Sequence, residues 1–91
     1  MKYIEILQEF LKEELEDYSA FRYEIHLEGE NSDHESYSVD FSLHNNHYTS
    51  VRFRVFQEEI MVQVQEDGSF YETNTHSYKV KYFWQAFLSW N

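Results

Sequence analysis

A chain of 91 residues with no proline, two glycines and no linker-like stretch predicts one small domain, covering residues 1–91. The absence of cysteine excludes disulfides and thiolate metal sites, and no apolar run reaches the roughly 18 residues that a membrane-spanning helix needs. Seventeen acidic residues against seven basic ones give a formal charge of −10, which disfavours direct contact with nucleic acid or an anionic membrane. We therefore expect a soluble, cytoplasmic domain.

The acidic residues are concentrated in the first part of the chain. Residues 1–40 hold twelve Asp and Glu against three Lys and Arg, whereas residues 41–91 hold five against four. Aromatic residues make up 20% of the sequence, which is enough for a chain this short to bury a substantial apolar core. The composition indicates a well-packed domain with an unevenly charged surface.

The first predicted element is an amphipathic helix over residues 2–18. Its apolar side chains recur every three or four residues, at Ile4, Leu7, Leu11, Leu15 and Tyr18. Four acidic residues crowd its last turns: Glu13, Glu14, Glu16 and Asp17. Negative charge is unfavourable there because the helix dipole is itself negative at that end. The arrangement costs stability without a visible benefit for folding.

Four segments then alternate apolar and polar residues, which predicts half-buried strands. They are residues 21–28, 37–43, 50–56 and 60–65, with a polar loop over residues 29–35. Short connections between them indicate an antiparallel meander. Asp67-Gly68 is a turn signal, and residues 69–73 could add a fifth strand.

The last segment has two interpretations. Residues 78–90 fit a helix with Val80, Trp84 and Phe87 on one stripe, although residues 77–82 also alternate like a strand. We prefer the helix because no turn residue interrupts the segment. The predicted fold is α+β, with an N-terminal and a C-terminal helix on one face of a four- or five-stranded antiparallel sheet and water on the other face.

Strand register was predicted by matching apolar faces, because a slip of one residue turns a strand over. For the first pair of strands this places Tyr23 opposite Phe41, and for the third and fourth it places Phe53 opposite Val62. For the second and third strands it places Phe41 opposite Val51.

The segment "LHNNHY" joins the second and third strands. The predicted register leaves Asn45, Asn46 and His47 as a three-residue turn, and a bulge beside a shorter turn would serve equally well. We prefer this hairpin to a metal site on His44 and His47. On the outer face the same register places Arg52 opposite Asp40, a favourable cross-strand pair.

Motifs that carry chemistry are weak in this sequence. There is no nucleophile elbow and no glycine-rich phosphate loop, so we expect no enzyme activity and no cofactor. Asp33, His34 and Glu35 are potential metal ligands, but neighbouring residues in a polar loop are more often only solvated. Glu24 beside Asp40 fits a surface charge ladder better than a catalytic carboxylate pair. No metal site is predicted.

The acidic bias is therefore the main functional signal. The candidate partner-binding residues form an electronegative surface: Glu13, Glu14, Glu16, Asp17, Glu28, Glu30, Asp33 and Glu35. Phe56 and Trp90 would add apolar anchors if they are exposed, and would be packing residues if they are not. The competing interpretation is that the charge only keeps a small domain soluble.

These features lead to two main functional hypotheses. The first is a small acidic protein-binding domain, similar in size and charge to inhibitor and immunity proteins, that docks on the basic surface of another protein. The second is an adaptor or chaperone-like domain that binds a peptide segment of another protein or forms a homodimer. An enzyme or small-ligand domain is the weakest alternative.

Overall fold

The computed structural model describes residues 2–14, 22–42, 48–66 and 68–76. Within them, helix α1 (Ile4–Glu14) precedes the strands β1 (Arg22–Glu30), β2 (His34–Ser42), β3 (Tyr48–Phe56), β4 (Ile60–Glu66) and β5 (Ser69–Asn74). The strands form one sheet in the order β1-β2-β3-β4-β5 with antiparallel neighbours. The predicted meander is confirmed, with the fifth strand. The predicted C-terminal helix lies outside the described residues.

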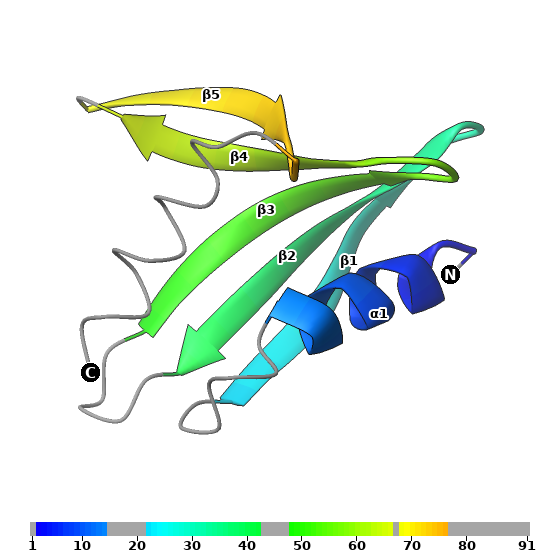
Figure 1. Cartoon of the computed structure of the whole chain (residues 1–91), viewed down its shortest axis with the longest axis horizontal. Coiled ribbons are helices and arrows are strands. Elements are labelled where there is room, and N and C mark those ends of the chain that lie inside the picture. The colour runs from blue at the N-terminus through cyan, green and yellow to red at the C-terminus, as the bar shows by residue number, and fades with distance from the viewer. Residues whose placement is uncertain (1, 15–21, 43–47, 67, 77–91) are drawn as a thin grey trace.

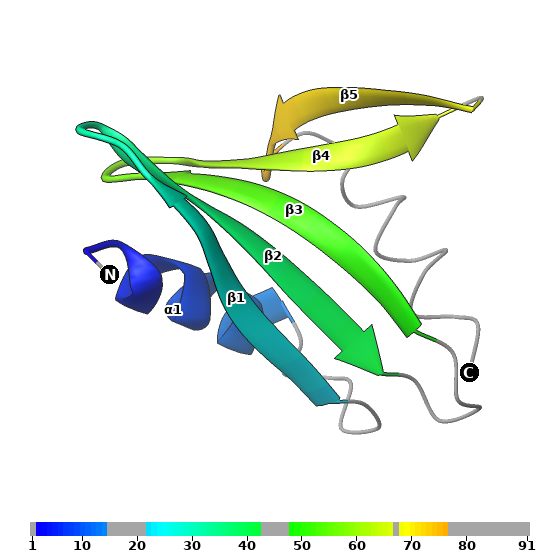
Figure 2. The same ribbon diagram turned by 180° about the vertical axis from the view of Figure 1, so that it is seen from behind.

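The helix covers one face of the sheet. α1 lies in front of β1 in Figure 1 and behind it in Figure 2, which shows the opposite face of the sheet. Both views show β4 and β5 turned relative to β1 to β3, as the right-handed twist of strands requires. We call the face under α1 the inner face and the opposite one the outer face.

The core forms between α1 and the inner face. Leu7 and Leu11 are fully buried, and Phe10 packs edge-on against Phe53 of β3 with 6.2 Å between ring centroids. On the strands the buried residues alternate as predicted: Tyr37, Val39 and Phe41 on β2, Val51, Phe53 and Val55 on β3, and Ile60, Val62 and Val64 on β4. On the edge strand β1, Tyr23 and Leu27 stay more than a third exposed.

The N-terminus of α1 is capped by a residue from the sheet. No Ser, Thr, Asp or Asn precedes the helix, so the usual side-chain cap is missing. Instead, the Glu35 carboxylate of β2 accepts a hydrogen bond from the backbone N–H of Tyr3 at 2.5 Å and from the Tyr37 hydroxyl at 2.6 Å. The carbonyl of Tyr3 in turn accepts the first α-helical bond, from the N–H of Leu7 at 3.4 Å, and a second bond from the N–H of Ile6 at 3.1 Å.

Glu35 is ionised in this position although its side chain is only 2% exposed. Burial opposes the charge, but hydrogen bonds from Tyr37 and from the backbone N–H groups of Tyr3 and Lys2 outweigh it, and the pKa of Glu35 falls to about 2. Burial and the hydrogen bond to Glu35 raise the pKa of Tyr37. Glu35 therefore joins α1 to β2 rather than contributing to the exposed acidic surface.

The register agrees with the prediction in two pairs of strands. Tyr23 lies opposite Phe41, and Phe53 lies opposite Val62. The predicted register between β2 and β3 is wrong by two residues, because Phe41 lies opposite Thr49 and not Val51. A slip of two keeps every side chain on its face, so matching apolar faces cannot detect it.

Two further predictions change with this register. The pairing ends at Ser42 and Tyr48, so the connection spans residues 43–47 rather than a three-residue turn, and its histidines lie outside the described residues. Arg52 lies opposite Ser38, not Asp40. Asp40 instead accepts a hydrogen bond from the Ser50 hydroxyl, and His26 Nε2 lies 3.1 Å from its carboxylate.

The predicted polar loop over residues 29–35 is shorter than expected. β1 continues to Glu30 and β2 begins at His34, so the pairing reaches Glu30 opposite Glu35. An irregularity between Leu27 and Gly29 accommodates the extra residue in β1. The longer hairpin places Glu35 on the inner face, where it reaches α1.

Candidate functional site

The structure divides the predicted acidic surface into two parts. Glu28, Glu30 and Asp33 are exposed on β1 and on the turn that follows it. Glu13 and Glu14 are exposed at the far end of α1. Glu35 holds the other end of α1, which is 11 residues or roughly 16 Å long.

Of the remaining predicted residues, the structure describes only Phe56. Phe56 is half-buried and packs against His34 with 5.0 Å between ring centroids, so its ring serves packing. Glu16, Asp17 and Trp90 lie outside the described residues. The single electronegative surface therefore stays a prediction, of which the described residues show these two groups.

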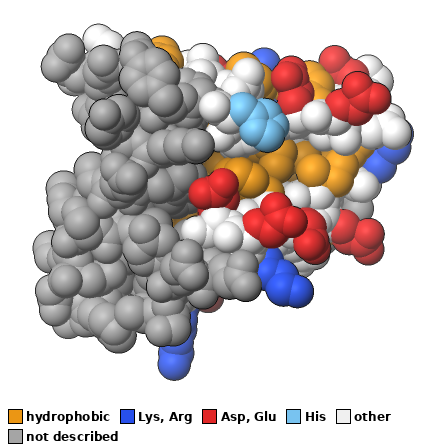
Figure 3. Space-filling view, in the orientation of Figure 1, with side chains coloured by type: hydrophobic (Ala, Val, Ile, Leu, Met, Phe, Trp, Pro, Cys, Tyr) orange, Lys and Arg blue, Asp and Glu red, His pale blue; other side chains and the backbone are white. Residues whose placement is uncertain are grey.

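A more coherent site is a groove beside α1, which we call the acidic groove. It has a volume of about 460 Å³ and lies between α1, the turn from β3 to β4, and the residues that follow β5. Its floor is formed by Ile6, Phe10 and Ile60. Its rim carries five glutamates: Glu5, Glu9, Glu13, Glu58 and Glu59. Figure 3 shows an apolar floor with acidic side chains around it.

Two short pieces of chain place these carboxylates. Glu5, Glu9 and Glu13 are spaced by four residues, which puts them in one row along α1. Glu58 and Glu59 lie in the turn closed by the bond from the Phe56 N–H to the Glu59 carbonyl, at 2.9 Å. The apolar floor continues the core, because Phe10 packs against Phe53 and Ile60 is almost fully buried.

Five glutamates and one histidine, His76, line the acidic groove. Within the part of the chain that the structure describes, none of the five glutamates has an ion-pair partner. Like charges four residues apart destabilise a helix by about 0.2–0.5 kcal/mol per pair, so the row on α1 is unfavourable for folding. The sequence analysis missed Glu5, Glu9, Glu58 and Glu59. The four-residue spacing was visible on α1, but nothing local connects that row with the turn.

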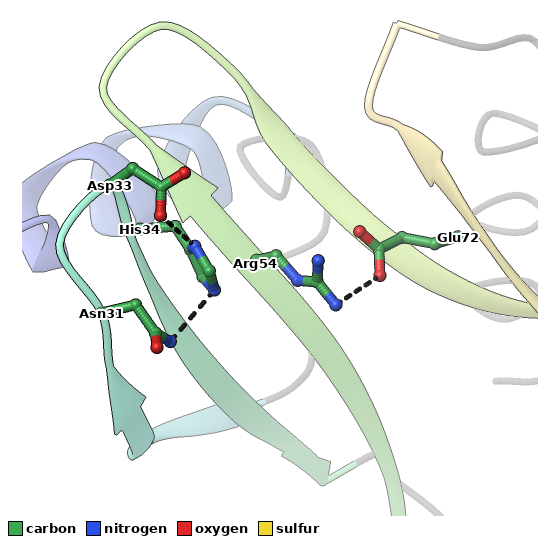
Figure 4. A network of polar contacts seen from close by, with 5 residues as sticks. All are labelled: Asn31, Asp33, His34, Arg54 and Glu72. Atoms are coloured by element: carbon green, nitrogen blue, oxygen red, sulfur yellow. Dashed lines mark hydrogen bonds and ion pairs between the residues drawn. The ribbon is translucent and has the colours of Figure 1, made fainter.

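A polar cluster at the turn between β1 and β2 has a structural explanation (Figure 4). His34 Nδ1 lies 2.7 Å from Asp33 Oδ1, and its Nε2 lies 3.1 Å from Asn31 Nδ2. A neutral ring that donates from Nδ1 and accepts at Nε2 satisfies both contacts. The hydrogen bond from His34 lowers the pKa of Asp33. The cluster closes the turn. In the described ranges no three His, Asp or Glu side chains are arranged to hold a metal ion.

A second cluster, on the outer face of β1 to β3, lacks the order of a nucleophile and its base. Ser50 donates its hydroxyl proton to Asp40 at 2.5 Å, and His26 approaches the same carboxylate at 3.1 Å. Glu24 lies 3.7 Å from His26. The serine therefore faces the acid rather than the imidazole, which is not the arrangement that activates a hydroxyl.

Comparison with known proteins gives no further assignment. No family model, no curated protein and no solved structure matches the chain. The described residues contain no helix of the length and apolar character needed to cross a membrane. The acidic groove is therefore the main functional feature of the described residues.

Proposed function

We propose that this chain is a small acidic protein-binding domain that docks on the basic surface of another protein, in the manner of an inhibitor or immunity protein. The observation that carries the proposal is the acidic groove, where five glutamates surround an apolar floor and have no ion-pair partner among the described residues. Charge that served solubility alone has no need to gather around the half-buried apolar side chains of Ile6 and Phe10.

The two parts of the groove have different roles in binding. The rim attracts Lys and Arg over a distance, which raises the association rate and makes it sensitive to salt. The floor buries apolar groups of the partner against Ile6, Phe10 and Ile60. This burial supplies the hydrophobic part of the binding free energy, which salt does not screen. The complementary partner surface presents an apolar side chain with Lys or Arg around it.

The proposal can be tested with a synthetic probe. The probe is an amphipathic helical peptide with leucine along one face and lysine along the flanking face. Its affinity is measured by calorimetry at low and high salt for the wild type and for the triple variant Glu5→Gln, Glu9→Gln, Glu13→Gln. At about 0.2–1 kcal/mol for each exposed charge pair, we expect the variant to bind about tenfold more weakly and with a smaller salt dependence.

The matched control removes the same charge elsewhere, with Glu14→Gln, Glu24→Gln and Glu28→Gln. These residues are exposed and lie outside the acidic groove. If the control loses as much affinity as the groove variant, binding follows net charge alone and the proposed site is wrong. Affinity that does not change with salt in the wild type overturns the electrostatic mechanism itself.

A further inference from the structure

The outer face of the sheet carries a second hollow, on the side away from α1. Its volume is about 350 Å³, at the small end of the range for ligand sites in proteins. Arg52 and Arg54 of β3 line it together with Met61 and Gln63 of β4 and Phe70 of β5. In the register, Arg54 lies opposite Met61, and Gln63 lies opposite Glu72.

The two arginines differ in what they contact. Arg54 extends from β3 toward β5 and pairs with Glu72 at 3.3 Å, as Figure 4 shows. Arg52 is exposed, and within the described ranges it has no hydrogen bond or ion pair. Its guanidinium, with five N–H donors in a planar fork, is therefore available in a molecule of net charge −10.

An apolar surface lies in the same hollow as this free cation. Phe70 is 65% exposed, more than any other large apolar side chain in the described residues. Met61 is half-buried and also lines the hollow. An exposed aromatic ring and an unpaired guanidinium in one hollow suit a ligand that has both an apolar body and an anionic group.

We propose that this hollow binds a small organic monocarboxylate, with its carboxylate on Arg52 and its apolar body against Phe70 and Met61. The planar fork of Arg52 fits a carboxylate with two parallel hydrogen bonds. Glu28 and Glu72 also line the hollow, so a doubly charged group such as a phosphate monoester would meet more repulsion than a single carboxylate does. The site is independent of the acidic groove, which lies on the other face.

The test is an NMR titration with 3-phenylpropionate, and with 3-phenylpropionamide as the uncharged analogue. We expect shift changes confined to residues of the hollow, and affinity for the acid at least about fivefold higher than for the amide. Arg52→Gln should weaken binding of the acid by about fivefold or more and leave the amide unchanged. Phe70→Ala should weaken binding of both probes.

Two controls separate this site from general charge and from the acidic groove. Arg22→Gln removes one exposed positive charge outside the hollow and should leave the affinity unchanged. The triple variant of the acidic groove should bind 3-phenylpropionate at least as well as the wild type does. Equal affinity for acid and amide, equal affinity in Arg52→Gln, or no saturable binding up to about 20 mM overturns the proposal, since a ligand this small is expected to bind within that range.

Discussion

Glu35 joins the N-terminus of α1 to the sheet. Its carboxylate receives the backbone N–H of Tyr3 at the positive end of the helix dipole and the hydroxyl of Tyr37 from its own strand. These contacts favour the ionised form, which is why its pKa falls although burial opposes the charge. Most helices are capped by a residue beside them in the sequence, whereas α1 is capped by Glu35, 32 residues after Tyr3.

The lowered pKa of Glu35 predicts how stability depends on pH. Its pKa is about 2 in the folded state against an ordinary 4.5, so its contribution is fully present above about pH 5 and is lost as the pH falls toward 2. Urea unfolding of the wild type and of Glu35→Gln across this range should show a gap in the free energy of unfolding that narrows toward pH 2. The exposed Glu58→Gln serves as control, and a gap that stays constant with pH would contradict the assignment.

Removing the hydroxyl of Tyr37 tests the same contact from the other side. Tyr37→Phe keeps the buried ring and deletes the donor to the Glu35 carboxylate. A hydrogen bond to a charged group of this kind contributes about 1.5–3 kcal/mol, so we expect the free energy of unfolding to fall by that amount at pH 7. The loss should be smaller in the Glu35→Gln background, and purely additive losses would show that the two groups do not interact.

At the scale of elements, α1 combines two stripes with opposite effects. Its apolar stripe joins the core through Leu7 and Leu11, whereas its row of glutamates faces the acidic groove. Leu7→Ala should cost about 2–5 kcal/mol, because it leaves a cavity under the helix. Thermal unfolding measures this cost. A loss below about 1 kcal/mol would mean that α1 contributes little to the core.

The turn between β4 and β5 depends on Gly68 for its backbone conformation, whereas Gly29 has no such role. Gly68 has φ of +81°, where a side chain is strained, although nothing lies within 4 Å of an added Cβ. Gly68→Ala should therefore destabilise the protein by about 1–2 kcal/mol. Gly29→Ala is the matched control, since Gly29 also has open space but no positive φ. Equal effects of the two substitutions would show that backbone conformation is not the cause.

For the whole molecule, the formal charge of −10 works against the compact state. Salt screens this repulsion, so raising the ionic strength from about 0.02 M to about 0.5 M should raise the melting temperature. Replacing Glu5, Glu9 and Glu13 by glutamine changes the formal charge from −10 to −7 and should weaken the response. Calorimetry at several salt concentrations measures the change of melting temperature with ionic strength. A melting temperature that falls with salt would contradict this account.

Local patterns were enough to predict α1, the strands and the face that the described apolar residues of β2, β3 and β4 take. Val39, Phe53 and Val62 are buried on one face as expected, because alternation along a strand is a property of neighbouring residues. Local patterns predict only part of the acidic groove. The row on α1 follows from its spacing, but its approach to Glu58, Glu59 and Ile60 joins segments more than forty residues apart.

Long-range contacts determined the rest. Alternation repeats every two residues, so it does not distinguish Phe41 opposite Thr49 from Phe41 opposite Val51. Glu35 has the sequence context of a loop residue, yet a longer hairpin brings it under the N-terminus of α1, where hydrogen bonds make its charge favourable. The observed register, which differs from the predicted one by two residues, places Arg52 opposite Ser38 and not Asp40. Its guanidinium is therefore available in the hollow of the outer face. Packing and pairing between distant segments select the register, and the register selects which charges meet.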